Sequence, residues 1–476
     1  MHAQLWKMHS VRRSRPFAGG YTIARPFMQY AVFFILFIGY TVSASGVPNT
    51  DMVVPPITDT TLSNGLRVLI VEKHTAPVVN ITVGYGVGSK NETKDNTGFA
   101  HFFEHLMFEG SLNVPHGFFD RYCTEAGGNN NAYTTYDKTV YYMMLPSNRL
   151  ELGLWLESDR MLAFGVTKES VDIQRNVVLE EINQNVENRP YGMLSNVQNG
   201  LAYVPSCSYS WDVYGDKSHI AHSPYEEVQK FFEDYYRPDN ACLVLCGDIY
   251  PEQALALVHK YFGDIPKRKA PGSRPVFKDS YRRGNTYRRV EDDIPMESLF
   301  LSYHFDGFTS ADYYVAEILA SILSDGMSSR LYRSLVYDKQ LSSEVNAYID
   351  DRELSSLFMV YAIGNTADIT CDQMYEALWT VLDDVARNGI SQQELMKAQN
   401  RLSTRLAQYY QQVTNIADEV AHNALFFNDP LRAFRYIDMV NAVTTDNVRN
   451  FARKVFQHSN QTRADFVPRT ASGTQK

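Results

Sequence analysis

The segment from Gly98 to Phe108 constrains this chain more than any other, because it holds two histidines four positions apart with a glutamate directly before the second. These residues are His101, Glu104 and His105. On a helix that turns about 100° per residue, their side chains fall within an arc of about 100°. Both imidazoles can then bind one Zn²⁺ ion while the carboxylate stands beside the metal. The segment therefore predicts a helix that carries two ligands of a zinc site.

The order H-x-x-E-H matches inverted zinc peptidases, and such a site needs a third protein ligand. The segment 168–188 is predicted to be helical, with an apolar stripe that begins at Val171. With Val171 at zero, Glu181 falls at about 280°, beside the stripe, and Glu180 at about 180°, on the opposite side. An inward carboxylate needs a partner, because burying it unpaired is costly. We therefore expect Glu181 to be the third ligand, Gln174 to support it, and Glu180 to be a solvated charge.

A third segment with a functional pattern lies between the two metal-binding segments. Residues 126–135 and 139–145 are β-rich runs separated by a polar turn, which indicates a hairpin. A solvent-facing strand rich in Asn, Ala and Thr, close to a metal, is suited to pairing its main chain with an extended peptide. An ordinary edge strand is the alternative that this pattern leaves open.

Composition limits the class of protein. A chain of 476 residues is too long for one ordinary hydrophobic core, so we expect two or more domains. A net charge of −9 argues against nucleic acid as a partner. The cysteine count is odd and includes no C-x-x-C pair, so a disulfide framework and a zinc ribbon are both disfavoured. We expect the cysteines to be small core residues.

The N-terminal residues 1–45 are predicted to be a signal peptide or other targeting segment. They are basic and lack acidic residues, and an apolar run at 30–40 precedes the small residues Val42-Ser43-Ala44. The run is short for a transmembrane helix. These features predict an exported, periplasmic protein; a retained membrane anchor and a mitochondrial presequence are the alternatives.

The remaining chain is predicted to form two α+β units built alike. Residues 53–266 form the zinc-bearing domain, 267–285 form an exposed linker rich in Lys, Arg, Pro and Gly, and 286–470 form a second domain. In the second domain a strand at 297–304 precedes a helix at 311–323 that contains no histidine pair. Only the first domain is therefore expected to bind metal.

Several ordered motifs together resemble the pitrilysin/insulinase family of inverted-motif zinc peptidases. The resemblance covers nearly all of the chain after Val53 and is strongest to the half-length branch, which includes mitochondrial processing peptidase and bacterial relatives. The motifs are G-F-A-H-F-F-E-H-L-M-F-E-G-S at 98–111, G-G-x-x-N-A-x-T at 127–134, R-N-V-V-L-E-E-I at 175–182, Y-R-P-D-N at 236–240, G-D at 247–248 and G-M-S-S-R-L at 326–331.

The resemblance implies a fold of class α+β. It consists of two homologous α/β-sandwich-type domains, each a mostly antiparallel sheet with helices on one face, and together they form one half of a clam-shell. It also implies that His101, His105 and Glu181 bind one zinc ion per chain and that Glu104 is the base that activates water. The substrate backbone is then held by the edge strand that contains Asn131, Ala132 and Thr134.

One departure from the family pattern concerns the second domain. Active members carry an Arg and a Tyr seven positions apart, in that domain or in a partner subunit, and here the two positions hold Val336 and Ser343. We therefore expect a heterodimer whose homologous partner lacks the zinc motif and supplies the Arg/Tyr pair. A homodimer is the alternative if Tyr332, Arg333 or Tyr337 substitutes.

The sequence thus predicts a zinc-dependent endopeptidase that cleaves unfolded or short peptides, as the catalytic subunit of a two-chain enzyme. Two alternatives remain open. One is a non-catalytic scaffold or core-type subunit of the same family. The other is a subunit that processes mitochondrial presequences.

Overall fold

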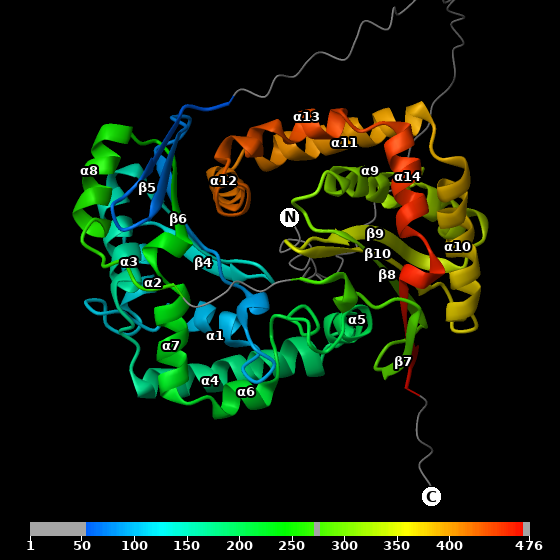
Figure 1. Cartoon of the computed structure of the whole chain (residues 1–476), viewed down its shortest axis with the longest axis horizontal. Helices are drawn as coiled ribbons and strands as arrows, with labels where there is room; N and C mark the ends of the chain where they lie inside the picture. The colour runs from blue at the N-terminus through cyan, green and yellow to red at the C-terminus, as the bar shows by residue number, and fades with distance from the viewer. Residues whose placement is uncertain (1–53, 271–276, 470–476) are drawn as a thin grey trace, which may run out of the picture. The chain divides into compact units, whose positions relative to one another are not determined.

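The computed structural model describes residues 54–270 and 277–469 (Figure 1). The predicted targeting segment at 1–45 lies outside the described residues, as does part of the predicted linker. From Pro55 onward the described residues belong to one compact unit. None of the helices within the described ranges is long and apolar enough to span a membrane.

The first half of this unit is built on a six-stranded sheet with strand order β1-β2-β6-β3-β5-β4. All neighbouring strands are antiparallel except β2 and β6, which are parallel. The Asn64-Gly65 turn joins β1 to β2, with Gly65 at φ +95°, a backbone conformation that favours glycine. The strands are β1 (Ile57–Thr61), β2 (Arg67–Glu72), β3 (Val78–Tyr85), β4 (Asn129–Thr134), β5 (Thr139–Pro146) and β6 (Ala241–Gly247).

The second half is built on a five-stranded sheet with strand order β7-β11-β8-β10-β9. Here only β7 and β11 are parallel. Two mostly antiparallel sheets with attached helices confirm the predicted α+β class. The strands are β7 (Thr286–Asp292), β8 (Ser298–Asp306), β9 (Ser342–Asp350), β10 (Ser355–Gly364) and β11 (Gln461–Pro468).

The helices follow the apolar periodicity of the sequence. Those of the first half are α1 (Phe99–Leu106), α2 (Phe118–Glu125), α3 (Leu150–Leu162), α4 (Lys168–Ile182), α5 (Leu194–Ala202), α6 (Lys217–His222), α7 (Tyr225–Tyr235) and α8 (Pro251–Phe262). Those of the second half are α9 (Asp312–Ser324), α10 (Cys371–Asn388), α11 (Gln392–Tyr409), α12 (Val413–Phe427), α13 (Tyr436–Asn441) and α14 (Thr445–Val455).

One helix of each half packs on the sheet of the other half, on the face opposite that sheet's own helices. The sequence does not predict this arrangement. α12 packs on β3 and β6, and Gly84 of β3 leaves so little room that a Cβ there would lie 3.1 Å from Leu425. α5 packs in the same way on the second sheet, where Val197 joins a buried cluster with Phe300 and Phe466. This exchange of helices ties the two halves together.

A buried arginine adds a polar link between the halves. Arg352 follows β9 and is completely buried. Its guanidinium donates to Asp350, to Asn199 Oδ1 at 2.6 Å and to the carbonyl oxygen of Tyr209 at 3.2 Å. It also lies 3.8 Å from the ring centre of Tyr136. Neighbouring charges and rings hold its pKa well above the usual value despite burial, so the group is a permanent cation.

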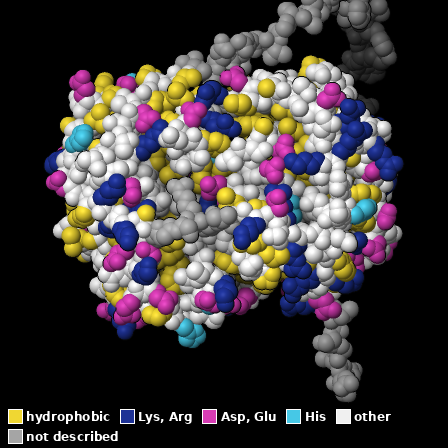
Figure 2. All heavy atoms as spheres, in the orientation of Figure 1, with side chains coloured by type: hydrophobic (Ala, Val, Ile, Leu, Met, Phe, Trp, Pro, Cys, Tyr) yellow, Lys and Arg dark blue, Asp and Glu magenta, His cyan; other side chains and the backbone are white. Residues whose placement is uncertain are grey.

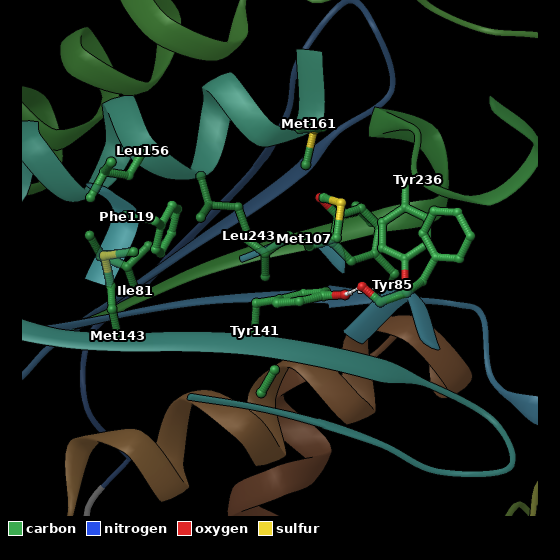
Figure 3. Close-up of a cluster of buried hydrophobic side chains, with 14 of the residues drawn as sticks. Ile81, Tyr85, Met107, Phe119, Tyr141, Met143, Leu156, Met161, Tyr236 and Leu243 are labelled. Carbon is green, nitrogen blue, oxygen red and sulfur yellow. Dashed lines mark hydrogen bonds between the residues drawn. The ribbon is translucent and has the colours of Figure 1, made fainter. Parts of the chain in front are cut away.

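The core of the first half contains tyrosines that fix α1 on the sheet (Figure 3). The rings of Tyr85 and Tyr236 lie 4.7 Å apart. The hydroxyl of Tyr141, on β5, donates to the carbonyl oxygen of Phe103 at 3.0 Å and lies 3.3 Å from the Tyr236 hydroxyl. A buried phenol needs such partners, so these contacts set where α1 sits relative to the sheet.

The cysteines lie in the protein core, and the surface visible in Figure 2 carries charges of both signs. All five cysteines are described, buried and free of disulfides, as predicted for small core residues. On the face shown in Figure 2, acidic and basic side chains are interspersed.

Candidate metal centre

The N-terminus of the helix that carries the H-x-x-E-H residues is capped by a glutamate from the preceding segment. Gly98 precedes α1 with φ +88°, a conformation that other residues rarely adopt. The buried carboxylate of Glu92 accepts the backbone N–H groups of Gly98 at 2.9 Å and Ala100 at 2.8 Å. The indole of Trp211 donates to the same carboxylate at 3.1 Å. Burial raises the pKa of Glu92 to about 8, against the effect of these three donors.

The predicted ligands come together at one point. The Nε2 atoms of His101 and His105 lie 3.3 Å apart. Glu181, from α4, places Oε2 at 3.1 Å from His105 Nε2 and Oε1 at 3.7 Å from His101 Nε2. One ligand atom from each residue lies within 4.8 Å of the others. Two imidazole nitrogens and one carboxylate oxygen are the donor set of a catalytic zinc site, so the residues present fit the ion.

The neutral imidazole of His101 and the ionised carboxylate of Glu181 suit a bound cation. Burial, together with the neighbouring His105, lowers the pKa of His101 to about 4, so its imidazole is neutral at pH 7. A neutral imidazole is the form that binds metal. Burial acts to lower the pKa of His105, but the Glu181 carboxylate raises it overall. Burial acts to raise the pKa of Glu181, yet the two histidines lower it below its usual value.

Glu104 stands beside this cluster and outside it. Its Oε2 accepts a hydrogen bond from the Thr134 hydroxyl of β4 at 2.8 Å. Burial raises the pKa of Glu104. The sequence predicts a substrate-binding role for Thr134, which stays a prediction. In the structure the Thr134 hydroxyl donates its hydrogen bond to Glu104, the candidate base. Thr134 thereby fixes the direction in which Glu104 points.

The strand predicted to bind the substrate backbone is an edge strand. Among the described strands, β4 pairs with β5 alone. Asn131 is exposed and accepts the N–H of Ala132 through its own side chain, whereas Ala132 is buried. Tyr133 donates a hydrogen bond to Asp418 of α12, so a helix of the second half fixes the position of this strand. The substrate role of Asn131 and Ala132 stays a prediction.

Other polar residues at the site are not apparent from the sequence. The hydroxyl of Tyr214 and the amide of Asn185 each lie 3.3 Å from Glu181 Oε1. Burial raises the pKa of Tyr214 to about 12, so its hydroxyl stays protonated and can donate a hydrogen bond. Asn185 lies in a π-helical turn, Asn183–Glu187, that no periodicity predicted.

Gln174 and Glu180, which also lie on α4, differ in their surroundings. Gln174 donates to Glu109 and makes no hydrogen bond to the predicted ligands in the described chain. Its predicted support of Glu181 is therefore not direct. Glu180 is exposed and accepts from Asn183 and Gln184, as expected of a solvated charge.

The two positions at which the resemblance implies Arg and Tyr lie just before β9 and at its start. Val336 is part of the helical turn Tyr332–Asp338 and packs against the core of the second half. The Ser343 hydroxyl donates to the carbonyl oxygens of Ile363 and Gly364. Of the predicted substitutes, Tyr337 is 73% exposed and available for contact with another molecule.

Comparisons with known proteins identify a matching family and similar chains. A family model described as Insulinase (Peptidase family M16) matches residues 67–200, and one described as Peptidase M16 inactive domain matches residues 224–402. The zinc protease PqqE of Helicobacter pylori is 30% identical over 342 residues, which are 71% of this chain and 76% of that protein. The beta subunit of the mitochondrial-processing peptidase of Blastocladiella emersonii is 25% identical over 428 residues, 87% of this chain and 89% of that protein.

A solved structure also matches. The crystal structure of a protease from Helicobacter pylori covers 87% of this chain and 100% of its own, with a TM-score of 0.81 and 26% sequence identity. The match spans both sheets, since it extends over most of the chain.

Proposed function

Because the chain belongs to the insulinase family of peptidases, peptidase family M16, we propose that it is a zinc-dependent endopeptidase. His101, His105 and Glu181 hold one zinc ion, and Glu104 is the catalytic base. The observation that carries this proposal is the convergence of two imidazole nitrogens and one carboxylate within 4.8 Å, next to a second carboxylate, Glu104, that accepts a hydrogen bond from Thr134.

When bound, zinc supplies Lewis-acid polarisation of the scissile carbonyl and acidifies a water molecule. Glu104 accepts the proton of that water and returns it to the leaving amine. Thr134 keeps the carboxylate turned toward the strand along which the substrate lies.

The substrate is an unfolded or short peptide. An edge strand offers its main chain to an extended segment, and pairing with β4 would place the segment beside Glu104. A folded protein cannot present such a segment without unfolding locally. Asn131 and Ala132 contribute the pairing backbone.

The active form contains a second subunit. Val336 and Ser343 cannot donate as the family's Arg and Tyr do, so a homologous partner without the zinc motif supplies that pair. The relative from Blastocladiella emersonii is itself named as a subunit. A homodimer in which Tyr337, Arg333 or Tyr332 acts instead is the alternative.

The absence of the Arg/Tyr pair also favours one competing role, that of a non-catalytic scaffold subunit. Against it stands the full set of His101, Glu104, His105 and Glu181, which a scaffold has no need to keep. The basic, acid-free N-terminal sequence with its apolar run supports export to the periplasm. Processing of presequences in mitochondria is the same chemistry in another compartment.

Hydrolysis of a mixed pool of short peptides by the purified full-length chain tests the proposed function. We expect cleavage that stops when a chelator removes zinc and returns when zinc is added back. Cleavage only after a homologous Arg/Tyr subunit is added would support the heterodimer. Zinc-independent cleavage, or none with or without such a subunit, would contradict the proposal.

A further inference from the structure

The backbone of a turn that the sequence does not predict packs against the N-terminus of α1, the helix that carries the two histidines. Residues 211–215 lie within the connection between α5 and α6, and Gly215 has φ +67°. A Cβ on Gly215 would lie 2.2 Å from the backbone nitrogen of Gly98, and a Cβ on Gly98 would lie 2.4 Å from the carbonyl oxygen of Tyr214. The two glycines therefore permit a backbone contact that no larger residue allows.

Hydrogen bonds on both sides fix this turn. Trp211 donates to Glu92, the residue that caps α1, and to the carbonyl oxygen of Ser89. On the other side, the backbone N–H of Asp216 donates to the Thr97 hydroxyl at 2.9 Å. The turn is thus held relative to α1 before any ligand arrives.

This fixed turn brings Tyr214 against two of the proposed ligands at once. Its ring packs edge-on against His101, with ring centres 4.8 Å apart. Its hydroxyl lies 3.3 Å from Glu181 Oε1. Asn185 completes a triangle, because its amide lies 3.3 Å from the same oxygen and 3.2 Å from the Tyr214 hydroxyl.

The two oxygens of Glu181 consequently have different surroundings. Oε1 accepts from Tyr214 and Asn185, whereas Oε2 faces His105 Nε2 at 3.1 Å. Donors on one oxygen stop the carboxylate from rotating and leave the other oxygen for the metal. Partners of this kind orient metal ligands and raise affinity in other proteins.

We propose that Tyr214 and Asn185 are positioning residues of the metal centre, which lock the orientation of Glu181 and, through the Tyr214 ring, that of His101. The inference rests on the proposed function, since it concerns the same zinc ion. It adds two residues that the H-x-x-E-H segment and α4 do not identify by themselves. Their role is exerted through the ligands, without contact to the substrate.

The test compares zinc affinity, measured by competition with a colorimetric chelator, in the wild type and in Tyr214→Phe, which keeps the ring and removes the hydroxyl. We expect affinity to fall by about tenfold, the lower end of the effect of such partners. Asn185→Ala should act alike, and the double variant should lose less than the product of the single losses, because both donors share one oxygen. The visible spectrum of the Co²⁺-loaded protein should change in both variants, because it reports ligand geometry.

Tyr225→Phe is the matched control. The Tyr225 hydroxyl donates to the carbonyl oxygen of Val166, outside the metal centre, so this variant should keep zinc affinity and the Co²⁺ spectrum of the wild type. Wild-type affinity and spectrum in Tyr214→Phe and Asn185→Ala would overturn the inference and leave the proposed function standing. A wild-type chain that binds no zinc would overturn both.

Discussion

Replacing Glu104 by glutamine should lower peptidase activity by about 10²- to 10⁴-fold, the usual contribution of a positioned acid–base group. Glutamine has nearly the same shape and can still bond to Thr134, so the helix and the metal centre should be preserved. Zinc content should therefore equal that of the wild type. The loss should appear in kcat, because the carboxylate acts on the proton that moves during the reaction.

Glu180→Gln provides the control for this experiment. Glu180 is a glutamate on the helix that carries the third proposed ligand, but it is exposed and accepts hydrogen bonds from Asn183 and Gln184 of the helical turn that follows. Its replacement should leave activity unchanged. Retention of wild-type activity by Glu104→Gln would remove Glu104 from the mechanism.

Replacing Arg352 by methionine should destabilise the protein by about 3 kcal/mol, the lower end of the range for breaking a buried ion pair. Methionine occupies part of the volume but leaves Asp350, Asn199 and the Tyr209 carbonyl without their donor. The lower end applies because Asp350 keeps some access to solvent. Since Arg352 joins the two halves, the transition in urea-induced unfolding should also become less cooperative.

Lys454→Ala is a suitable comparison for that variant. Lys454 also pairs with two carboxylates, Asp306 and Asp312, but its side chain is 56% exposed. Exposed pairs contribute little to stability, so a change below about 1 kcal/mol is expected. If Arg352→Met proved as mild as Lys454→Ala, Arg352 would not hold the halves together.

The features of the site that depend on the geometry of a single helix, α1 or α4, could be predicted from the sequence. The spacing of His101 and His105 requires only helical geometry, and the apolar stripe of α4 fixed the phase of Glu181. The structure places the Glu181 carboxylate within 3.7 Å of both histidine nitrogens. Local hairpins such as the one at Asn64-Gly65 were predictable for the same reason, since turn chemistry is local.

The parts that depend on segments far apart in the chain could not be predicted. Tyr214 reaches Glu181 because two glycines let one backbone lie on another, and neither glycine reveals its partner. The contact of the Thr134 hydroxyl with Glu104 depends in the same way on the position of β4 beside α1, and the predicted contact of Thr134 with substrate stays a prediction. The packing of α12 on the first sheet is likewise set by long-range contact.

The zinc content of Glu181→Gln and Glu180→Gln, measured by mass spectrometry after dialysis against a weak chelator, tests the central claim most directly. The two variants remove neighbouring carboxylates from one helix turn, so they differ in the direction that the side chain faces. We predict one zinc ion per chain in the wild type and in Glu180→Gln, and loss of most of the zinc in Glu181→Gln. Equal zinc content in the two variants would contradict the proposed metal centre.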